Sequence, residues 1–191
     1  MKINIKQNLK IISQIEKSRS KNNINWMDIL RIALKSSPKN TIKILKKINP
    51  SGLILTGGEN FGVNKPRDKL EKKLLQHFSL KRKPILGICR GAQMIAKFFG
   101  VNLVKVKKHV GVNHKTIIAT QDKLFPKVIN SFHEYGIKRC PKNFITTVLH
   151  KDNTIEAFKH KKFKWEGWMW HPEREKTFST ESLKRIKKIF S

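Results

Sequence analysis

The sequence contains few cysteines, few acidic residues and no long hydrophobic run. Only two cysteines, Cys89 and Cys140, occur among 191 residues. They form no CxxC pair and no Cys/His spacing typical of zinc, so we predict no metal site. A disulfide framework is equally excluded in a reducing compartment.

No apolar stretch approaches the roughly 20 residues that a membrane-spanning helix needs. The first residues, MKINIKQNLKIISQ, alternate polar and apolar side chains and lack a signal-peptide core and cleavage site. We therefore expect a cytoplasmic protein with no membrane association. The length and a hydrophobic content of 38% predict one folded domain spanning residues 1–191.

Acidic residues are scarce beside basic ones: 13 Asp and Glu against 42 Lys and Arg, for a net charge of +29. One interpretation is an anionic partner such as nucleic acid, a nucleotide or acidic lipid. The other is the composition of an AT-rich genome, since Lys, Asn and Ile are heavily used together. The basic residues are scattered along the chain without a block, which favours the second interpretation and predicts no specific nucleic-acid binding. An anionic small substrate fits either.

Strand and helix patterns alternate in the first half of the chain. Apolar runs at Gly52–Leu55 and Pro84–Ile88 predict buried strands, and each is followed by a helical pattern. Asp68, with Glu71 three residues later, is a candidate capping box for the first of these helices. The order strand, helix, strand, helix predicts a mostly parallel sheet covered on both faces, an α/β three-layer sandwich.

Other elements are expected on both sides of this core. Lys2–Lys6 is predicted as a first strand, and Trp26–Leu34 and the segment between Pro38 and Pro50 have helical spacing. After Val101 several β-like segments follow, so the second half should add extra strands. A C-terminal amphipathic helix is predicted over Thr180–Phe190.

A candidate nucleophile lies at Gly87-Ile88-Cys89-Arg90-Gly91, the cysteine form of the G-x-S-x-G elbow. The predicted strand runs directly into a helix at Cys89, where free N–H groups and the helix dipole favour a thiolate. A buried structural cysteine is the alternative, because short motifs match by chance. The strand-turn-helix context favours the nucleophile.

A candidate base follows the apolar segment WEGWMW, at His171-Pro172-Glu173. A spacing of two in extended backbone points His171 and Glu173 to the same side. Glu173 would then orient the imidazole, whose other nitrogen faces the thiol. A solvated surface loop is the alternative for this tripeptide alone. A third segment, Thr56-Gly57-Gly58, ends an apolar strand where an oxyanion hole is built, although an ordinary turn would give the same letters.

Four segments together carry a resemblance to a known family. LILTGG, PILGICRGAQ, NSFHEYGI and WMWHPERE, in this order, resemble class I glutamine amidotransferases and the related γ-glutamyl hydrolases. The resemblance runs from about Leu53 to Glu175. It implies the glutamine amidotransferase-like (flavodoxin-like) fold and an enzyme that cleaves a γ-glutamyl amide through a γ-glutamyl thioester. It implies no metal and no organic cofactor.

The resemblance also implies roles for individual residues. Cys89, His171 and Glu173 match the family's catalytic triad, and Gly58 and Arg90 match its oxyanion positions. Gln93 matches a substrate-contacting glutamine, and its position four residues after Cys89 puts it on the same side of the helix. The other expected substrate contacts are Gly57, Asn130, Ser131, Phe132 and His133, the last four in a predicted loop or polar turn.

Within the family, the segments are most similar to the stand-alone γ-glutamyl-CDP-amidate hydrolases of bacterial capsule synthesis. That similarity implies an anionic, nucleotide-linked γ-glutamyl substrate, with glutamate and cytidine diphosphoramidate as products. Two alternatives remain open: a glutaminase subunit that supplies ammonia to a separate synthase, and a basic binding protein without catalysis. His109 and His114 flank a turn after the elbow helix and are candidates for leaving-group contacts, although lone histidines are more often structural. Cys140 has no base nearby and is expected to be non-catalytic.

Overall fold

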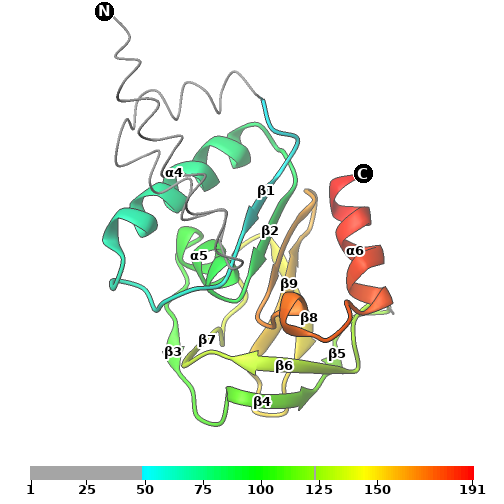
Figure 1. Ribbon diagram of the computed structural model, residues 1–191. Helices are drawn as coiled ribbons and strands as arrows, with labels where there is room; N and C mark the ends of the chain where they lie inside the picture. Colours follow the sequence, from blue (N-terminus) through cyan, green and yellow to red (C-terminus); the bar gives the residue numbers. More distant parts are fainter. Residues whose placement is uncertain (1–48, 123) are drawn as a thin grey trace, which may run out of the picture. The chain divides into compact units, whose positions relative to one another are not determined.

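The computed structural model describes residues 49–122 and 124–191 (Figure 1). The strand predicted at Lys2–Lys6 and the helix predicted at Trp26–Leu34 lie outside these residues, as does nearly all of the segment between Pro38 and Pro50. The organisation of residues 1–191 as one domain therefore stays a prediction.

A six-stranded sheet forms the centre of the described part, in the order β1-β2-β10-β9-β8-β5. Strand β2 pairs in parallel with both β1 and β10, while the remaining neighbours pair antiparallel. Strands β1 and β2 come from the predicted strand-helix-strand region, whereas β10 and the antiparallel strands belong to the extra strands expected after Val101. The bounds are β1 Leu53–Leu55, β2 Ile85–Ile88, β5 Ile117–Ile118, β8 Phe144–Leu149, β9 Ile155–His160 and β10 Trp165–Trp168.

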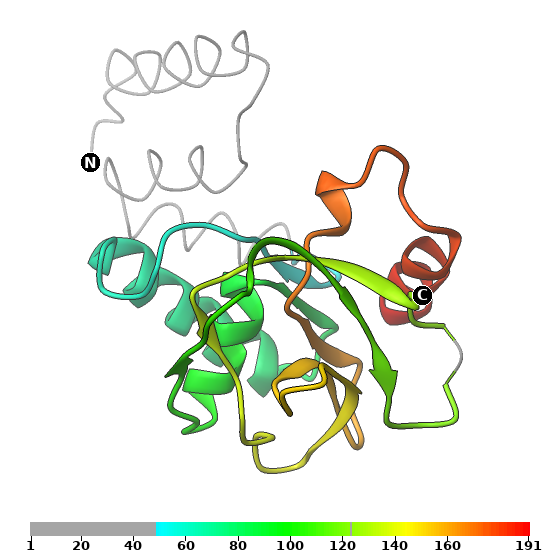
Figure 2. The same ribbon diagram turned by 90° about the horizontal axis from the view of Figure 1, so that it is seen from below.

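Helices cover both faces of this sheet (Figures 1 and 2). Helices α4 (Lys65–Leu80) and α5 (Arg90–Phe98) pack on β1, β2 and β10 on one face. Helix α6 (Thr180–Phe190), whose bounds match the prediction, covers the other face, where Ile189 joins the apolar cluster of Leu86 and Trp168. Residues alternate along β2, so Leu86 and Ile88 face α6 while Gly87 lies against α5. The predicted α/β sandwich is confirmed, but its sheet is mixed and not mostly parallel, since two of the five strand pairings are parallel and three are antiparallel.

The start of α4 differs from the predicted capping box. Asn64 caps the helix by accepting from the Arg67 amide at 3.2 Å, and Pro66 occupies the first turn. Asp68 and Glu71 are thereby freed for other partners. The predicted cap was wrong because an asparagine before a proline provides a cap one turn earlier.

Two small antiparallel sheets flank the main one. Strand β3 (Val104–Lys105) pairs with β7 (Tyr135–Gly136), and β4 (Val110–Lys115) pairs with β6 (Val128–Phe132). The segment Asn130–Phe132, predicted as a loop or polar turn, is therefore strand, and its partner in the pairing lies at Val110–Asn113. No helix among residues 49–122 and 124–191 is long and apolar enough to cross a membrane.

Candidate active site

Three neighbouring strand ends bring the predicted site residues to one edge of the sheet. Leu55, the last residue of β1, is in register with Gly87, and Trp168, the last residue of β10, is in register with Ile88. Because these strands are parallel, their carboxyl ends meet at the same edge. The segments that follow them carry Gly57, Cys89 and His171.

Cys89 occupies a strained turn between β2 and α5. Its φ of 48° and ψ of −105° lie in a region that non-glycine residues rarely adopt, at a cost of about 1–3 kcal/mol. Its amide donates to the Trp168 carbonyl at 2.6 Å. A Cβ on Gly87 would meet the Gly91 carbonyl carbon at 2.5 Å, and one on Gly91 would meet the Leu55 carbonyl oxygen at 2.1 Å. Both glycines of the motif are thus required for the elbow to close.

His171 and Glu173 form a direct pair. The imidazole Nδ1 lies 2.5 Å from Glu173 Oε1, so the Nδ1–H donates to the carboxylate and the lone pair of a neutral ring is on Nε2. The pair forms through a 3-10 turn, Pro172–Arg174, and not through the extended backbone that the sequence predicts. The turn brings the Glu173 carboxylate back to the His171 ring, so the predicted pair forms through a different backbone conformation.

Asn130 fixes the backbone of His171 from strand β6. Its side-chain oxygen accepts from the His171 amide at 2.9 Å, and its side-chain nitrogen donates to the His171 carbonyl at 2.8 Å. The Phe132 ring meets the imidazole edge-on at 6.0 Å. On another side, a Cβ on Gly57 would lie 2.4 Å from the imidazole, so only glycine fits there. The ring is therefore confined on several sides.

Burial dominates the electrostatics of the thiol. Desolvation raises the pKa of Cys89 to about 12, although the backbone N–H of Arg90 and the charge of Arg174 lower it. The helix terminus alone therefore does not produce the thiolate that the sequence predicts. The Glu173 carboxylate is close enough to raise the pKa of the thiol further. Burial would also raise the pKa of Glu173, but the hydrogen bond from His171, a backbone hydrogen bond and the charges of His171 and Arg174 together outweigh it and lower that pKa.

A buried ionic network supports the loop after β1. Glu71, which is 0% exposed, pairs with Arg67 at 2.7 Å and also with Arg90, whose guanidinium contacts Asp68 as well. Arg67 donates in turn to the carbonyls of Thr56 and Gly57, at 3.0 and 2.9 Å. The backbone of the predicted oxyanion loop is thus tied to the residue that follows Cys89.

The glutamine amidotransferase class-I family model matches residues 9–187 of this sequence. The chain belongs to this family. It is 36% identical over 145 residues to a gamma-glutamyl-CDP-amidate hydrolase of Campylobacter jejuni, covering 73% of this chain and 69% of the relative. It is also 32% identical over 171 residues to a glutamine-hydrolyzing GMP synthase subunit of Pyrococcus abyssi, covering 84% and 87%.

Solved structures of other proteins share the fold of this chain. A putative GMP synthase subunit from Thermoplasma acidophilum superimposes with a TM-score of 0.64 at 21% identity, covering 81% of this chain and 86% of that one. A glutamine amidotransferase from Thermotoga maritima gives a TM-score of 0.57 at 20% identity, with 77% and 74% covered. At these identities the likeness concerns the fold alone.

The structure places the predicted substrate contacts in different surroundings. Gln93 is buried and donates to the Tyr135 carbonyl at 2.8 Å, so part of its amide is already engaged. Ser131 is buried and donates to the His109 carbonyl. His133 points into a cluster of histidines that also contains His109 and His114. Of the segment Asn130–His133, only Asn130 and Phe132 contact His171.

Arg67 and Glu71 were missed in the sequence, although both support the site. Their spacing of four on a helix was a usable signal, since such pairs face the same side. Glu156 was missed too, and no local pattern marks it: it lies in β9, with three histidines from two other segments around it.

Proposed function

We propose that this protein hydrolyses a γ-glutamyl amide. Cys89 is the nucleophile, His171 is the general base and acid, and Glu173 orients His171. One observation carries the proposal: a strained cysteine elbow and a His-Glu pair follow two adjacent parallel strands, β2 and β10. This combination supports the proposal, because an activated nucleophile needs a base that a third group holds in place.

The reaction then proceeds in two halves. His171 Nε2 takes the proton of the Cys89 thiol, and the thiolate sulfur attacks the γ-carbonyl carbon. Backbone N–H groups of Gly58 and Arg90 stabilise the resulting oxyanion. The carbon–nitrogen bond breaks as His171 gives its proton to the leaving nitrogen, which leaves a γ-glutamyl thioester on Cys89. Water, deprotonated by His171, attacks the thioester and releases glutamate and the free thiol.

The proposed leaving group is anionic, with γ-glutamyl-CDP-amidate favoured and capsule phosphoramidate synthesis as its setting. A groove of about 660 Å³ lies along α4 and α5, and four lysines line it together with Phe61. Phe61 and Lys97 also line a second pocket of about 290 Å³ that reaches Gln93, one turn after Cys89. Ammonium groups suit a diphosphate, and the aromatic ring suits a base. The groove lysines are Lys65, Lys69, Lys72 and Lys97.

The similarity to the GMP synthase subunit of Pyrococcus abyssi favours a second candidate function. That relative is matched over 87% of its length, so a chain of this size also fits a subunit that passes ammonia to a separate synthase. The two functions differ in the nucleophile's substrate: glutamine for the ammonia-supplying protein, and a substituted γ-glutamyl amide for the hydrolase.

Side-by-side assays separate the two functions. Purified protein is incubated with glutamine and with γ-glutamyl-CDP-amidate, and glutamate release is measured. We expect kcat/KM to be at least about 100-fold higher for the CDP-amidate, which corresponds to about 2.7 kcal/mol. Charge reversal at Lys69 and Lys72 should raise KM for the CDP-amidate and leave glutamine unaffected, whereas Lys81→Glu serves as a control outside the groove. Faster turnover of glutamine would favour the synthase subunit.

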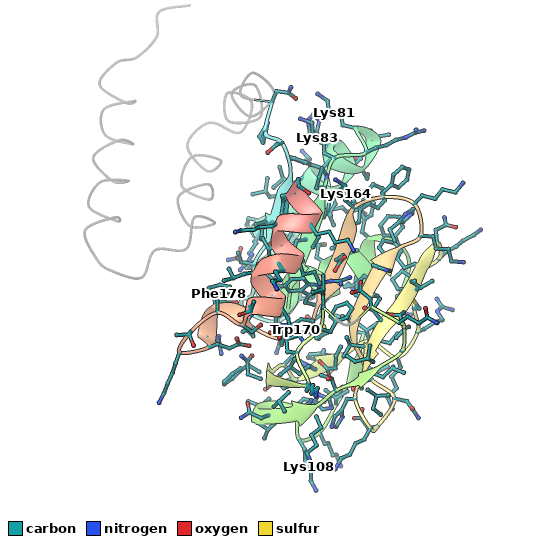
Figure 3. All side chains as sticks on the ribbon, turned by 90° about the vertical axis from the view of Figure 1, so that its right-hand side faces the viewer. Lys81, Lys83, Lys108, Lys164, Trp170 and Phe178 are labelled. Carbon is teal, nitrogen blue, oxygen red and sulfur yellow. The ribbon has the colours of Figure 1, made fainter. Side chains whose placement is uncertain are left out.

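Basic side chains outside this groove lie at both ends of the described part of the chain. Figure 3 shows Lys81, Lys83 and Lys164 at one end of the sheet and Lys108 at the other. We therefore expect weak oligonucleotide binding that is lost near 0.15 M salt, where charges are screened over about 8 Å. Saturable oligonucleotide binding at that salt, undisplaced by CDP, would favour the basic binding protein instead.

A further inference from the structure

Four histidines and two carboxylates gather in one cluster between the β4–β6 ribbon (Figure 1) and the main sheet. His109 directly precedes β4 and His114 lies near its end, while His133 follows β6 and Glu156 lies in β9. The rings of the histidine pairs lie 3.9–5.0 Å apart between centroids. Glu156 is 0% exposed and the three histidines are 1–5% exposed. His150 and Asp152 complete the cluster from the β8–β9 turn.

The outer nitrogens of three histidines are committed as donors. His109 Nε2 lies 2.9 Å from Asp152 Oδ2, His114 Nε2 lies 3.2 Å from the Lys108 carbonyl, and His133 Nδ1 lies 3.0 Å from the Tyr135 carbonyl. Each partner oxygen is an acceptor, so each of these nitrogens carries the hydrogen. In a neutral ring the other nitrogen then carries a lone pair.

The inner nitrogens all face one carboxylate. His109 Nδ1 and His114 Nδ1 lie 3.5 and 3.6 Å from Glu156 Oε1, and His133 Nε2 lies 3.7 Å from Glu156 Oε2. Within residues 49–122 and 124–191, these three nitrogens and Glu156 Oε2 have no hydrogen-bond partner. The lone pairs of the three inner nitrogens repel the Glu156 carboxylate that they face. In a buried cluster, a cation between the nitrogens and the carboxylate relieves this repulsion.

Protons are a costly way to relieve this repulsion. Three protonated rings against Glu156 would bury an excess of positive charge, at several kcal/mol per uncompensated ion. One divalent cation removes the repulsion and leaves all three rings neutral.

The distances also fit a metal ion. Zinc–nitrogen bonds of about 2.0–2.1 Å give a tetrahedron whose edges are about 3.3 Å, and the three edges that join the histidine nitrogens to Glu156 measure 3.5–3.7 Å. The ligand atoms of His109, His133 and Glu156 lie within 4.8 Å of one another, and those of His109, His114 and His150 form a second group of the same size. A histidine that binds a metal through one ring nitrogen usually donates its other ring N–H to a carboxylate or a carbonyl, as these three rings do.

We propose that His109, His114, His133 and Glu156 bind a divalent transition-metal ion of the zinc class in a structural site. Four protein ligands leave no open position for substrate, so the ion holds structure and takes no part in the chemistry. It joins β4 and the end of β6 to β9. Since β6 also carries Asn130, which fixes His171, the ion stabilises the support of the His-Glu pair. The sequence suggested no metal because the four ligands come from three segments, and only His109 and His114 are near each other in the sequence.

Metal content of the full chain, without a histidine tag, tests this directly. The protein is stripped with a chelator, reconstituted with Zn²⁺ or Co²⁺, and analysed for bound metal. We expect about one ion per chain and the visible absorption of four-coordinate Co²⁺. The unfolding temperature should rise on reconstitution.

Variants identify the ligands. His109→Ala and Glu156→Gln should each weaken metal binding on the order of 100-fold or more. This is a larger effect than the loss of a group that only hydrogen-bonds to a ligand. His77→Ala, outside the cluster, should bind as wild type. If a variant does not fold, the wild-type Co²⁺ titration decides alone. A reconstituted wild type without bound ion, or folded His109→Ala and Glu156→Gln proteins with the wild-type spectrum, would overturn the proposal. None of these measurements depends on catalytic activity.

Discussion

The two halves of the described chain contribute to the candidate site in different ways. Residues 53–98 form parallel strands and helices in which close backbone contacts at Gly87 and Gly91 create the nucleophile elbow. Residues 104–160 form antiparallel strands, whose side chains hold His171 and bury a polar cluster. The first half is specified by local motifs, and the second by contacts between distant segments. Five predictions test this division, from the largest expected effect to the smallest.

Loss of the elbow thiol should have the largest effect. Cys89→Ala should reduce kcat by about 10⁴-fold or more, because the covalent route is lost. Cys140→Ser, the matched control at the half-buried second cysteine, should retain nearly full activity. Steady-state glutamate release from the favoured substrate measures both. Near-normal turnover by Cys89→Ala would end the assignment.

The His-Glu pair should show a graded response. His171→Ala should lower kcat by about 10³–10⁴-fold, the range of general acid-base catalysis. Glu173→Gln should lower it by about 10–100-fold, because Glu173 orients the ring without carrying the proton, and its side chain is 49% exposed. A reversed order in single-turnover assays would mean that the two roles are misassigned.

The stability of residues 53–98, which contain the nucleophile elbow, should depend on their buried ionic network. Glu71→Ala leaves Arg67 buried without a carboxylate and Arg90 with Asp68 alone, which we expect to cost about 3–5 kcal/mol of unfolding free energy. Lys73→Ala, an exposed position on the same helix, should change it by less than about 0.5 kcal/mol. Urea unfolding gives both values. A Glu71→Ala cost below about 1 kcal/mol would show that the network is dispensable.

The residues of this division explain what was predictable from the sequence. The elbow, the HPE tripeptide and helix α6 are encoded within a few residues, so pattern and spacing were sufficient. The role of Asn130 was not encoded locally, because it depends on β6 approaching His171 across 41 residues of sequence. The histidine cluster required the pairing of β4 with β6 and the position of Glu156, none of which the sequence reveals. The helix cap was misassigned because two candidate caps lie within one turn.

The position of His171, the proposed base, should depend on Asn130. Asn130→Ala removes both hydrogen bonds to the His171 backbone, and we expect kcat to fall by about 10-fold, with KM nearly unchanged. Asn113→Ala, at the position paired with Asn130 on β4 and exposed, is the control. If Asn130→Ala raised only KM, the side chain would contact substrate, as the family resemblance implies for this segment.

The ionisation state of the thiol gives the smallest and most specific effect. A pKa raised to about 12 means that roughly 10⁻⁵ of the Cys89 thiol is ionised at pH 7 in the free protein. Because only the thiolate reacts, alkylation by the neutral reagent iodoacetamide should accelerate about tenfold per pH unit from pH 6 to 9, without a plateau. The measurement is made in the Cys140→Ser background, so that one thiol is followed. Cys89→Ala in that background gives the blank. A plateau near pH 7 would instead indicate a preformed thiolate paired with protonated His171, and the base would then act before substrate binds.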